Sequence, residues 1–554
     1  MNRKLRVALW LESYGIPAWF YTCIAKVVRS YYAEIILIIV GSEGKGEGGI
    51  SKIKRKNNAG GLYHIYRCID QWLSPNLPDA QEVKDIRELL QNTPIIQLDL
   101  SNLKKSKTCE TAIHERIKKY SLDVIVKQEM QADLVGIEAT AKYGIWGYRF
   151  GEMSSQPNSV YGFWEVMLKE PVTQSSLVCV SADGETEVIL YSSMSQTDHI
   201  SIHRNNNRVY WKTLEYVPKI FGELHDFGEY EFNKRISQKN LHPIYHSDTP
   251  RNMPKWYEVI FLVARLYLRY LIKKILLLVW YEQWFILFNI TDEKVAKTEI
   301  SGYKKLIPPK DRFWADPFVV EKGGTYHIFL EEYIYKVNKG HIACLSINKD
   351  GEYTEPVKVL VANCHLSYPF LFQYKDVLYM IPEMAERQVI DLYQCVAFPD
   401  CWKKVKTLMS GVKAVDTTLL VHNDLWWLFT SLSENEGVST FDELFIYYSD
   451  DLINHEWIPH PRNPVVSDVR SARPAGRIYR FNGNLYRPSQ NCSRRYGYGI
   501  SINKITTLTT KDYDEICIEQ IEPCWGNGIL ATHTVNHTKG MTVIDAMQER
   551  VRFV

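Results

Sequence analysis

The sequence predicts two different folds in series: an α/β domain with a doubly wound parallel sheet, then an all-β domain with five propeller blades. Two observations lead to this prediction. Through the first 240 residues, apolar strand-like runs alternate with helix-like stretches, which is typical of parallel sheets. The second half repeats a strand–turn–strand pattern about every 50 residues, which is typical of a β-propeller.

Composition agrees with a large folded protein and excludes one class of partner. The chain has 554 residues and is 45% hydrophobic, enough for several cores. Lys and Arg number 66 against 64 Asp and Glu, so the net charge is only +2 and we expect no nucleic-acid partner. Aromatic residues make up 13%, which suits both β-structure and stacking on sugar rings.

The first domain is placed at residues 1–240. Buried-strand runs at 6–11 and 34–41 flank a helical pattern at 17–30, and 123–126 is a further short apolar strand. The first apolar run is too short for a secretion signal, and the eleven cysteines include no CxxC pair. We therefore expect free thiols in the cytoplasm, with no metal site and no cofactor.

Residues 241–283 form a linker with an apolar helix that begins near residue 256. Arg265, Arg269 and Lys273 are spaced i, i+4, i+8 on one helix face, with Lys274 at its border, and most other residues are large and apolar. This pattern predicts a helix in a membrane interface across residues 256–283, so that the protein is peripheral at the inner membrane face. A helix packed between domains and a true membrane span are the alternatives.

The propeller domain is placed at residues 284–554. Each repeat begins with one polar or aromatic residue, and these residues are separated by 52, 48, 57 and 60 positions. They are Asp316, Tyr368, Asp416, Arg473 and His533. Because the innermost strand of each blade lines the central channel, we expect the five to converge at one channel mouth. Glu331, Glu383, Gln490 and Asp545 end the following strands and should lie near the same mouth.

Several motifs in this domain resemble a known family. They are FWADPF at 313–318, HLSYP at 365–369, YMIPE at 379–383, HPRNP at 460–464, ARPAGR at 472–477 and YG at 496–497. Together they resemble the propeller domain at the N-terminus of plant glucosamine inositolphosphorylceramide transferase, whose bacterial relatives occur in surface-polysaccharide contexts. More distantly, the domain is similar to the five-bladed glycosidases that include arabinanases, xylosidases and invertases.

The glycosidase resemblance implies roles for individual residues. Asp316 matches the family's base or nucleophile, and Asp416 matches the carboxylate that tunes and orients it. The family's acid is a Glu that opens the fourth blade, where this chain has Arg473. Glu383 or Glu331 could supply the missing acid, although neither lies at the matching place, and we choose Glu383; His533 completes the predicted catalytic set.

The fourth repeat is rich in arginine, at Arg470, Arg473, Arg477 and Arg487. Arginine binds phosphate with paired hydrogen bonds, and a phosphate leaving group needs charge stabilisation more than a strong acid. We therefore predict a phosphorylated sugar donor. The alternative is that some of these arginines pair with Asp468, Glu383 and Asp416 as part of the structure. The other predicted substrate contacts are His365, Tyr368, Gln490 and Tyr496.

The first domain resembles a degenerate formyltransferase domain, a Rossmann-like fold, at 143–151, 162–166 and 170–173. The family places Asn-x-His at the end of one strand and an Asp about 35 residues later. Here the Asn and His positions match Gly147 and Arg149, and the Asp position falls near Glu185. The resemblance implies a scaffold or an acceptor-binding module.

The sequence thus predicts a carbohydrate-active enzyme of bacterial surface-glycan biosynthesis. It would transfer a sugar or sugar phosphate from a phosphorylated donor to a glycan or lipid-linked acceptor. The alternatives are a glycoside hydrolase, an amino-sugar N-formyltransferase and a non-catalytic carbohydrate-binding propeller.

Overall fold

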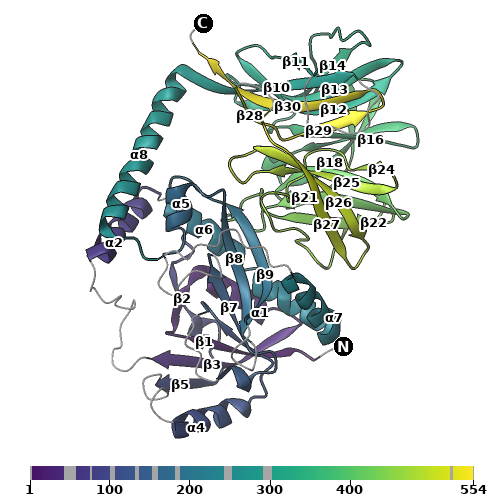
Figure 1. The fold of residues 1–554 in the computed structure, drawn as a ribbon. Coiled ribbons are helices and arrows are strands. Elements are labelled where there is room, and N and C mark those ends of the chain that lie inside the picture. Colours follow the sequence, from purple (N-terminus) through teal and green to yellow (C-terminus); the bar gives the residue numbers. More distant parts are fainter. Residues whose placement is uncertain are drawn as a thin grey trace. The chain divides into compact units, whose positions relative to one another are not determined.

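The computed structural model describes residues 3–42, 58–74, 78–99, 107–130, 137–151, 160–180, 187–241, 252–290, 302–524 and 528–552. The chain divides into two compact units. The first comprises Met1–Ser193 and Thr197–Leu268, and the second comprises Met194–Gln196 and Arg269–Val554. Figure 1 shows the elements of both units.

The first unit is built on a seven-stranded sheet with the order β5-β3-β1-β6-β7-β8-β9. Its strands are β1 Leu5–Leu11, β3 Ala33–Ser42, β5 Ile95–Asp99, β6 Val124–Lys127, β7 Ile145–Phe150, β8 Val172–Val180 and β9 Glu187–Gln196. Neighbouring strands from β5 to β7 run parallel, and β8 runs antiparallel to β7. The predicted strands at 6–11, 34–41 and 123–126 are β1, β3 and β6.

Helices cover both faces of this sheet, which explains why its central strands are apolar on both sides. The helices are α1 Ala18–Val28, α2 Asn58–Trp72, α4 Lys107–Lys118, α5 Phe163–Leu168, α6 Ile202–Thr213 and α7 Tyr216–Leu241. On one face, Trp19 of α1 and Phe221 of α7 pack in a core with Trp146. On the other face, Ile117 of α4 packs with Ile125. The prediction of an α/β domain is confirmed, but the sheet is mixed rather than wholly parallel, because β8 runs antiparallel to β7.

The predicted apolar helix is α8, Trp256–Val279. Val259, Leu262 and Leu266 are buried in a cluster that includes Phe163 and Ile202 of the first unit. None of the helices in the described part of the chain combines the length and apolar character that crossing a bilayer requires. One face of the first half of α8 is therefore packed on protein, as in the alternative prediction of a packed helix.

The second unit contains five sheets, and the prediction of a five-bladed propeller is confirmed. The first blade is β12 Arg312–Lys322, β13 Thr325–Ile334, β14 Lys339–Ile347 and β15 Val357–Leu360, and the second is β16 Ser367–Tyr374, β17 Val377–Glu383, β18 Val389–Ala397 and β19 Cys401–Ser410. The third is β20 Ala414–His422, β21 Leu425–Leu432, β22 Leu444–Ser449 and β23 Ile458–Pro459. The fourth is β24 Tyr479–Phe481, β25 Asn484–Asn491, β26 Gly499–Leu508 and β27 Tyr513–Ile521.

The fifth blade joins the two ends of the propeller chain. It comprises β10 Trp280–Ile290, β11 Lys304–Leu306, β28 Ile529–Ala531, β29 Val535–Thr538 and β30 Met541–Val551. β10, from the start of the domain, pairs with β30, from its end, along the whole length from Trp280↔Val551 to Ile290↔Met541. This antiparallel pairing closes the ring of blades (Figure 1).

Large aromatic residues pack neighbouring blades against each other, as the repeat predicts. Trp426 on β21 contacts Phe372 and Tyr374 of the preceding blade at 5.8 and 5.1 Å between ring centroids. Phe318 of the first blade likewise packs edge-on against Tyr368 of the second. Much of the aromatic excess therefore lies between blades.

Replacing Ile286 by alanine should lower the free energy of unfolding of the propeller by about 2–5 kcal/mol, because the side chain is fully buried on β10 opposite Asp545 of β30. Urea unfolding followed by tryptophan fluorescence measures the change. The matched control is Ile516→Ala on β27, whose side chain is 60% exposed and should change stability by less than about 0.5 kcal/mol. Equal losses of unfolding free energy in the Ile286 and Ile516 variants would contradict closure of the ring through β10 and β30.

Candidate functional site

Three blades start with the same backbone distortion. Asp316, Tyr368 and Asp416 have φ of 51°, 41° and 52°, in the left-handed region that non-glycine residues rarely adopt. Each lies where the pairing of the first two strands of its blade shifts register. A bulge of this kind bends the strand and redirects a side chain. The repeat therefore reflects one local geometry used three times.

Carboxylates of one blade accept the backbone N–H groups of these bulges in the next blade. Asp545 Oδ2 accepts from Asp316 N at 3.1 Å, and Asp316 Oδ2 accepts from Tyr368 N at 3.3 Å. Glu383 Oε2 accepts from Asp416 N at 3.1 Å. The predicted leading residues and strand-end carboxylates are thus brought together. We call Asp316, Glu383, Asp416, Arg473, His533 and Asp545 the mouth cluster.

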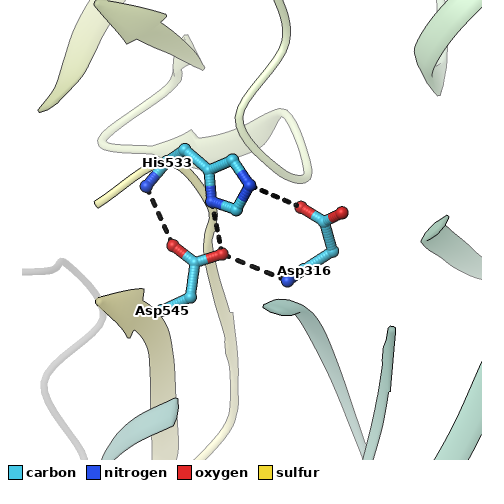
Figure 2. A group of neighbouring side chains, drawn as sticks. All are labelled: Asp316, His533 and Asp545. Carbon is cyan, nitrogen blue, oxygen red and sulfur yellow. Dashed lines mark hydrogen bonds and ion pairs between the residues drawn. The ribbon is translucent and has the colours of Figure 1, made fainter. Parts of the chain in front are cut away.

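One half of the mouth cluster is a chain of ion pairs (Figure 2). His533 Nε2 lies 3.6 Å from Asp316 Oδ1, and His533 Nδ1 lies 2.6 Å from Asp545 Oδ2. Thr534 Oγ1 also donates to Asp316 Oδ1, at 2.6 Å. Burial by itself lowers the pKa of His533, but the charges of Asp545 and Asp316 outweigh it and raise this pKa to about 9.

Asp316 titrates far from its ordinary range. Burial raises the pKa of Asp316 to about 7; His533 opposes this rise, and the carboxylates of Asp416, Glu331 and Asp545 add to it. The ligand atoms of Asp316, His533 and Asp545 lie within 4.8 Å of one another, close enough to hold a metal ion. With no metal bound, the raised pKa of His533 makes the group an imidazolium between two carboxylates.

The other half of the mouth cluster surrounds Arg473. Its Nε donates to Asp416 Oδ2 at 2.5 Å, and its Nη2 lies 3.7 Å from Glu383 Oε2. Gln490 Nε2 donates to the same Asp416 oxygen at 2.7 Å. Burial, and then the charge of Asp416, raise the pKa of Glu383 well above its ordinary value, although Arg473 opposes this. The cluster therefore favours a neutral Glu383 beside an ion-paired Asp416.

A column of rings and cations lies alongside the carboxyl groups. Trp284 stacks on His533 at 4.1 Å between centroids, and Tyr496 contacts His533 edge-on at 5.3 Å. The Arg473 guanidinium lies 5.1 Å from the Tyr496 ring and 5.4 Å from the Phe441 ring. A Cβ on the neighbouring Gly497, at φ of 61°, would come within 3.0 Å of both His533 and Trp284, so this loop requires glycine.

Sequence reasoning missed Trp284 and Phe441. Trp284 lies on β10, ahead of the first repeat, and Phe441 lies in the loop before β22. Neither position belongs to the repeated pattern, so periodicity could not find them. The aromatic content of the chain was the one available signal.

His365 lies beside the mouth cluster rather than in it. Its Nε2 is 3.2 Å from Glu331 Oε1, and its Nδ1 accepts from Gly340 N at 3.0 Å. Burial alone would lower the pKa of His365, but the hydrogen bond and charge of Glu331 outweigh it, so the pKa is raised. The imidazole is about a quarter exposed and remains a candidate sugar contact.

Three of the four arginines of the predicted cluster have other partners in the structure. Arg470 pairs with Asp468 at 2.6 Å, and buried Arg487 pairs with Glu515 and donates to the Ser471 and Ala472 carbonyls. Arg477 donates to the Leu371 carbonyl, and burial lowers its pKa. Of the four, Arg473 alone belongs to the mouth cluster. It pairs there with Glu383 and Asp416, as predicted by the alternative in which arginines form ion pairs within the structure.

Tyr368 was predicted to contact substrate, and its side chain is instead in the core. The ring has no exposed surface. Its hydroxyl is 2.9 Å from Thr418 Oγ1 and accepts from Gly476 N at 2.8 Å. The hydroxyl is the single polar atom of the side chain, and because it is satisfied inside the protein it is not free to contact a sugar. Gln490 is equally buried and holds Asp416 instead of facing solvent.

The formyltransferase positions in the first unit carry an ion pair. Arg149, at the position where the resemblance calls for a His, has its Nη2 2.7 Å from Glu187 on β9, two residues beyond Glu185. A Cβ on Gly147 would meet Met130 at 3.1 Å. Glu185 lies outside the described residues. The resemblance of this unit to formyltransferases stays a prediction.

Comparison with known proteins confirms the resemblance of the propeller. Residues 304–524 match the family described as glucosamine inositolphosphorylceramide transferase 1, N-terminal. Two similar relatives are the proteins named glucosamine inositolphosphorylceramide transferase 1 from rice, Oryza sativa subsp. japonica, and from Arabidopsis thaliana. They are 35% identical over 207 residues and 36% identical over 208 residues. These matches cover 37% of this chain, but only 28% and 27% of the relatives' own lengths.

Solved glycosidases are similar at a lower level. The catalytic domain of an α-L-arabinofuranosidase from Coprinopsis cinerea is 15% identical, with a TM-score of 0.31, over 42% of this chain and 80% of that one. A β-fructofuranosidase from Bombyx mori is 13% identical, with a TM-score of 0.31, over 44% and 61%. At these TM-scores the similarity supports no conclusion about the chemistry of this chain.

His533 should stay protonated at neutral pH and titrate near pH 9, because Asp545 and Asp316 face its two ring nitrogens. Nitrogen NMR of histidine-labelled protein measures this. The charged form of His533 stabilises the fold fully below about pH 6.5, and this stabilisation is lost as the pH rises through about 9.

Asp545→Asn should move the His533 titration toward 6.5, since one facing charge is removed. The matched control is Asp450→Asn, because Asp450 is exposed and pairs with a different histidine, His455. A His533 titration near 6.5 in the unaltered protein would contradict the ion-pair chain.

Proposed function

We propose that this chain is a carbohydrate-active enzyme that transfers a sugar or sugar phosphate from a phosphorylated donor to a glycan or lipid-linked acceptor. One observation carries the proposal. The mouth cluster holds two carboxyl groups whose pKa values burial raises, that of Glu383 well above its ordinary value and that of Asp316 to about 7, beside Asp416, which is ion-paired with Arg473. A carboxylic acid that stays protonated near neutral pH, with further carboxylates beside it, is what glycosyl chemistry requires.

Each group then has a role. Neutral Glu383 gives a proton to the leaving oxygen, and ionised Asp316 takes the proton of the incoming hydroxyl. Asp416, held by Arg473 and Gln490, faces the positive charge that develops on the sugar ring. Glu383, Tyr496 and Phe441 are partly exposed, and a donor would enter past them.

Two cations favour a phosphorylated donor over simple hydrolysis. Arg473 occupies the place where the related hydrolases carry their acid, and His533 is cationic up to about pH 9. Together they stabilise the negative charge of a departing phosphate. Since Arg470, Arg477 and Arg487 are engaged elsewhere, this part of the proposal depends on these two residues alone.

The curated relatives support transfer as the reaction class. They are named glucosamine inositolphosphorylceramide transferase 1. This chain spans about a quarter of their length. For this chain we propose an acceptor of the lipid-linked class, used at the cytoplasmic face of a membrane. We retain bacterial surface-glycan synthesis as part of the proposal, although the relatives compared are plant proteins.

A second candidate function is a non-catalytic carbohydrate-binding propeller. Asp316, Glu383 and Asp545 all accept backbone N–H groups across blades, which is a structural task. Arg473 is also nearly buried between two carboxylates. In this case the mouth binds sugar without reaction.

Asp316→Asn and Glu383→Gln should each lower donor turnover by about 100-fold or more, because an amide can neither accept nor give the proton. A panel of sugar phosphates and nucleotide sugars, assayed for release of phosphate or nucleotide, measures this. The amides keep the inter-blade hydrogen-bond acceptors, so folding is preserved. Asp450→Asn, on an exposed turn, is the matched control and should leave turnover unchanged.

Calorimetry with the same donors separates the two candidates. Binding without release in the unaltered protein would favour the binding propeller and overturn the transferase proposal. Cleavage of aryl furanosides with no donor release would favour the hydrolase.

The rate of transfer should rise with pH through about 7, because Asp316 must be ionised to act as base and its pKa is raised to about 7. A pH profile of kcat/KM measures this. An ascending limb near pH 4, the ordinary range of an aspartate, would show that Asp316 is not the base.

A further inference from the structure

The second half of α8 exposes large apolar side chains over nearly half of its circumference. These side chains have between 43% and 68% of their surface exposed. They are Leu268, Leu271, Ile272, Ile275, Leu276, Leu278 and Val279. From Leu268 to Val279, no residue is buried. So much exposed apolar surface on one helix is unusual in a soluble protein and marks an interaction surface.

The first half of α8 has two distinct apolar faces. Val259, Leu262 and Leu266 are buried against the first unit. On the opposite side, Tyr257, Ile260 and Phe261 are exposed. Successive residues of a helix turn by about 100°, so these exposed residues continue into the same stripe as Leu271 and Ile275. We call the exposed apolar residues on this side, from Tyr257, Ile260 and Phe261 to Leu271 and Ile275, the α8 stripe.

Basic residues border the α8 stripe. Arg265 lies at one edge of the stripe and Lys274 at the other, while Arg269 and Lys273, at i+4 and i+8 from Arg265, continue onto the opposite face. Glu258, in the first turn, is the one acidic residue of α8. Arg552 also donates to the Leu277 carbonyl at the end of the helix. An apolar face with cations on both edges is the pattern of a helix lying in a lipid interface.

We infer that the α8 stripe inserts into the surface of an anionic bilayer, with the basic residues of α8 among the headgroups. A span is disfavoured, since the described part of α8 lacks the apolar length to cross. A second copy of the chain fits less well, because paired stripes would bring Arg265 and Lys274, at the two edges, near the like charges of the partner copy. This inference depends on α8 and not on the mouth cluster, so either can fail alone.

Flotation of the full chain with vesicles tests the inference. The protein should float with phosphatidylcholine vesicles that contain phosphatidylserine, and float less with phosphatidylcholine alone. Leu271→Gln with Ile275→Gln should weaken binding by about tenfold or more, because two inserted apolar side chains are lost. Arg265→Glu with Lys273→Glu should remove the preference for anionic vesicles.

The matched control is Ile516→Gln with Ile518→Gln on β27, whose side chains are equally exposed and should not affect flotation. Failure of the unaltered chain to float with either vesicle would overturn the inference, as would equal losses in control and stripe variants. If sedimentation instead shows a dimer that the Leu271 and Ile275 changes dissolve, a second copy covers the stripe. Donor release is assayed without vesicles and is unaffected by these outcomes.

Discussion

The propeller depends on backbone N–H groups that carboxylates of the adjacent blade satisfy. Left-handed φ at a non-glycine residue costs about 1–3 kcal/mol, and Asp316, Tyr368 and Asp416 all adopt it. A hydrogen bond contributes about 0.5–1.5 kcal/mol to a neutral acceptor and about 1.5–3 kcal/mol to a charged one, which is of the same order as that strain. The carboxylates of Asp545, Asp316 and Glu383 thus join blade five to one, one to two, and two to three.

This arrangement links stability to chemistry. The oxygens that hold the bulges belong to the carboxyl groups whose protonation we assign to catalysis, and burial both strengthens the hydrogen bonds and shifts the pKa values. Removing Asp316 or Glu383 altogether would confuse loss of fold with loss of function. An amide replacement keeps the acceptor oxygen and removes only the titration.

Charge is balanced within the channel mouth and unbalanced on α8. In the mouth, His533 and Arg473 face carboxylates at ion-pair distance, so the buried charges are compensated. On α8 the basic residues border exposed apolar surface, with Glu258 as the single acid. Compensated charge suits a reaction site, whereas an excess of one sign suits a partner of the opposite sign.

The sequence by itself determined the α/β sheet, the five blades and the convergence of Asp316, Asp416 and His533, because strand periodicity and a 50-residue repeat are local signals. Only the tertiary structure decided which of the polar residues remain available to contact a substrate. It buried Tyr368 and dispersed the arginines, Arg477 among them, because pairing partners such as carbonyls and carboxylates arrive from distant blades. Spacing along the chain carries no information about such contacts, because they form only when the ring of blades closes.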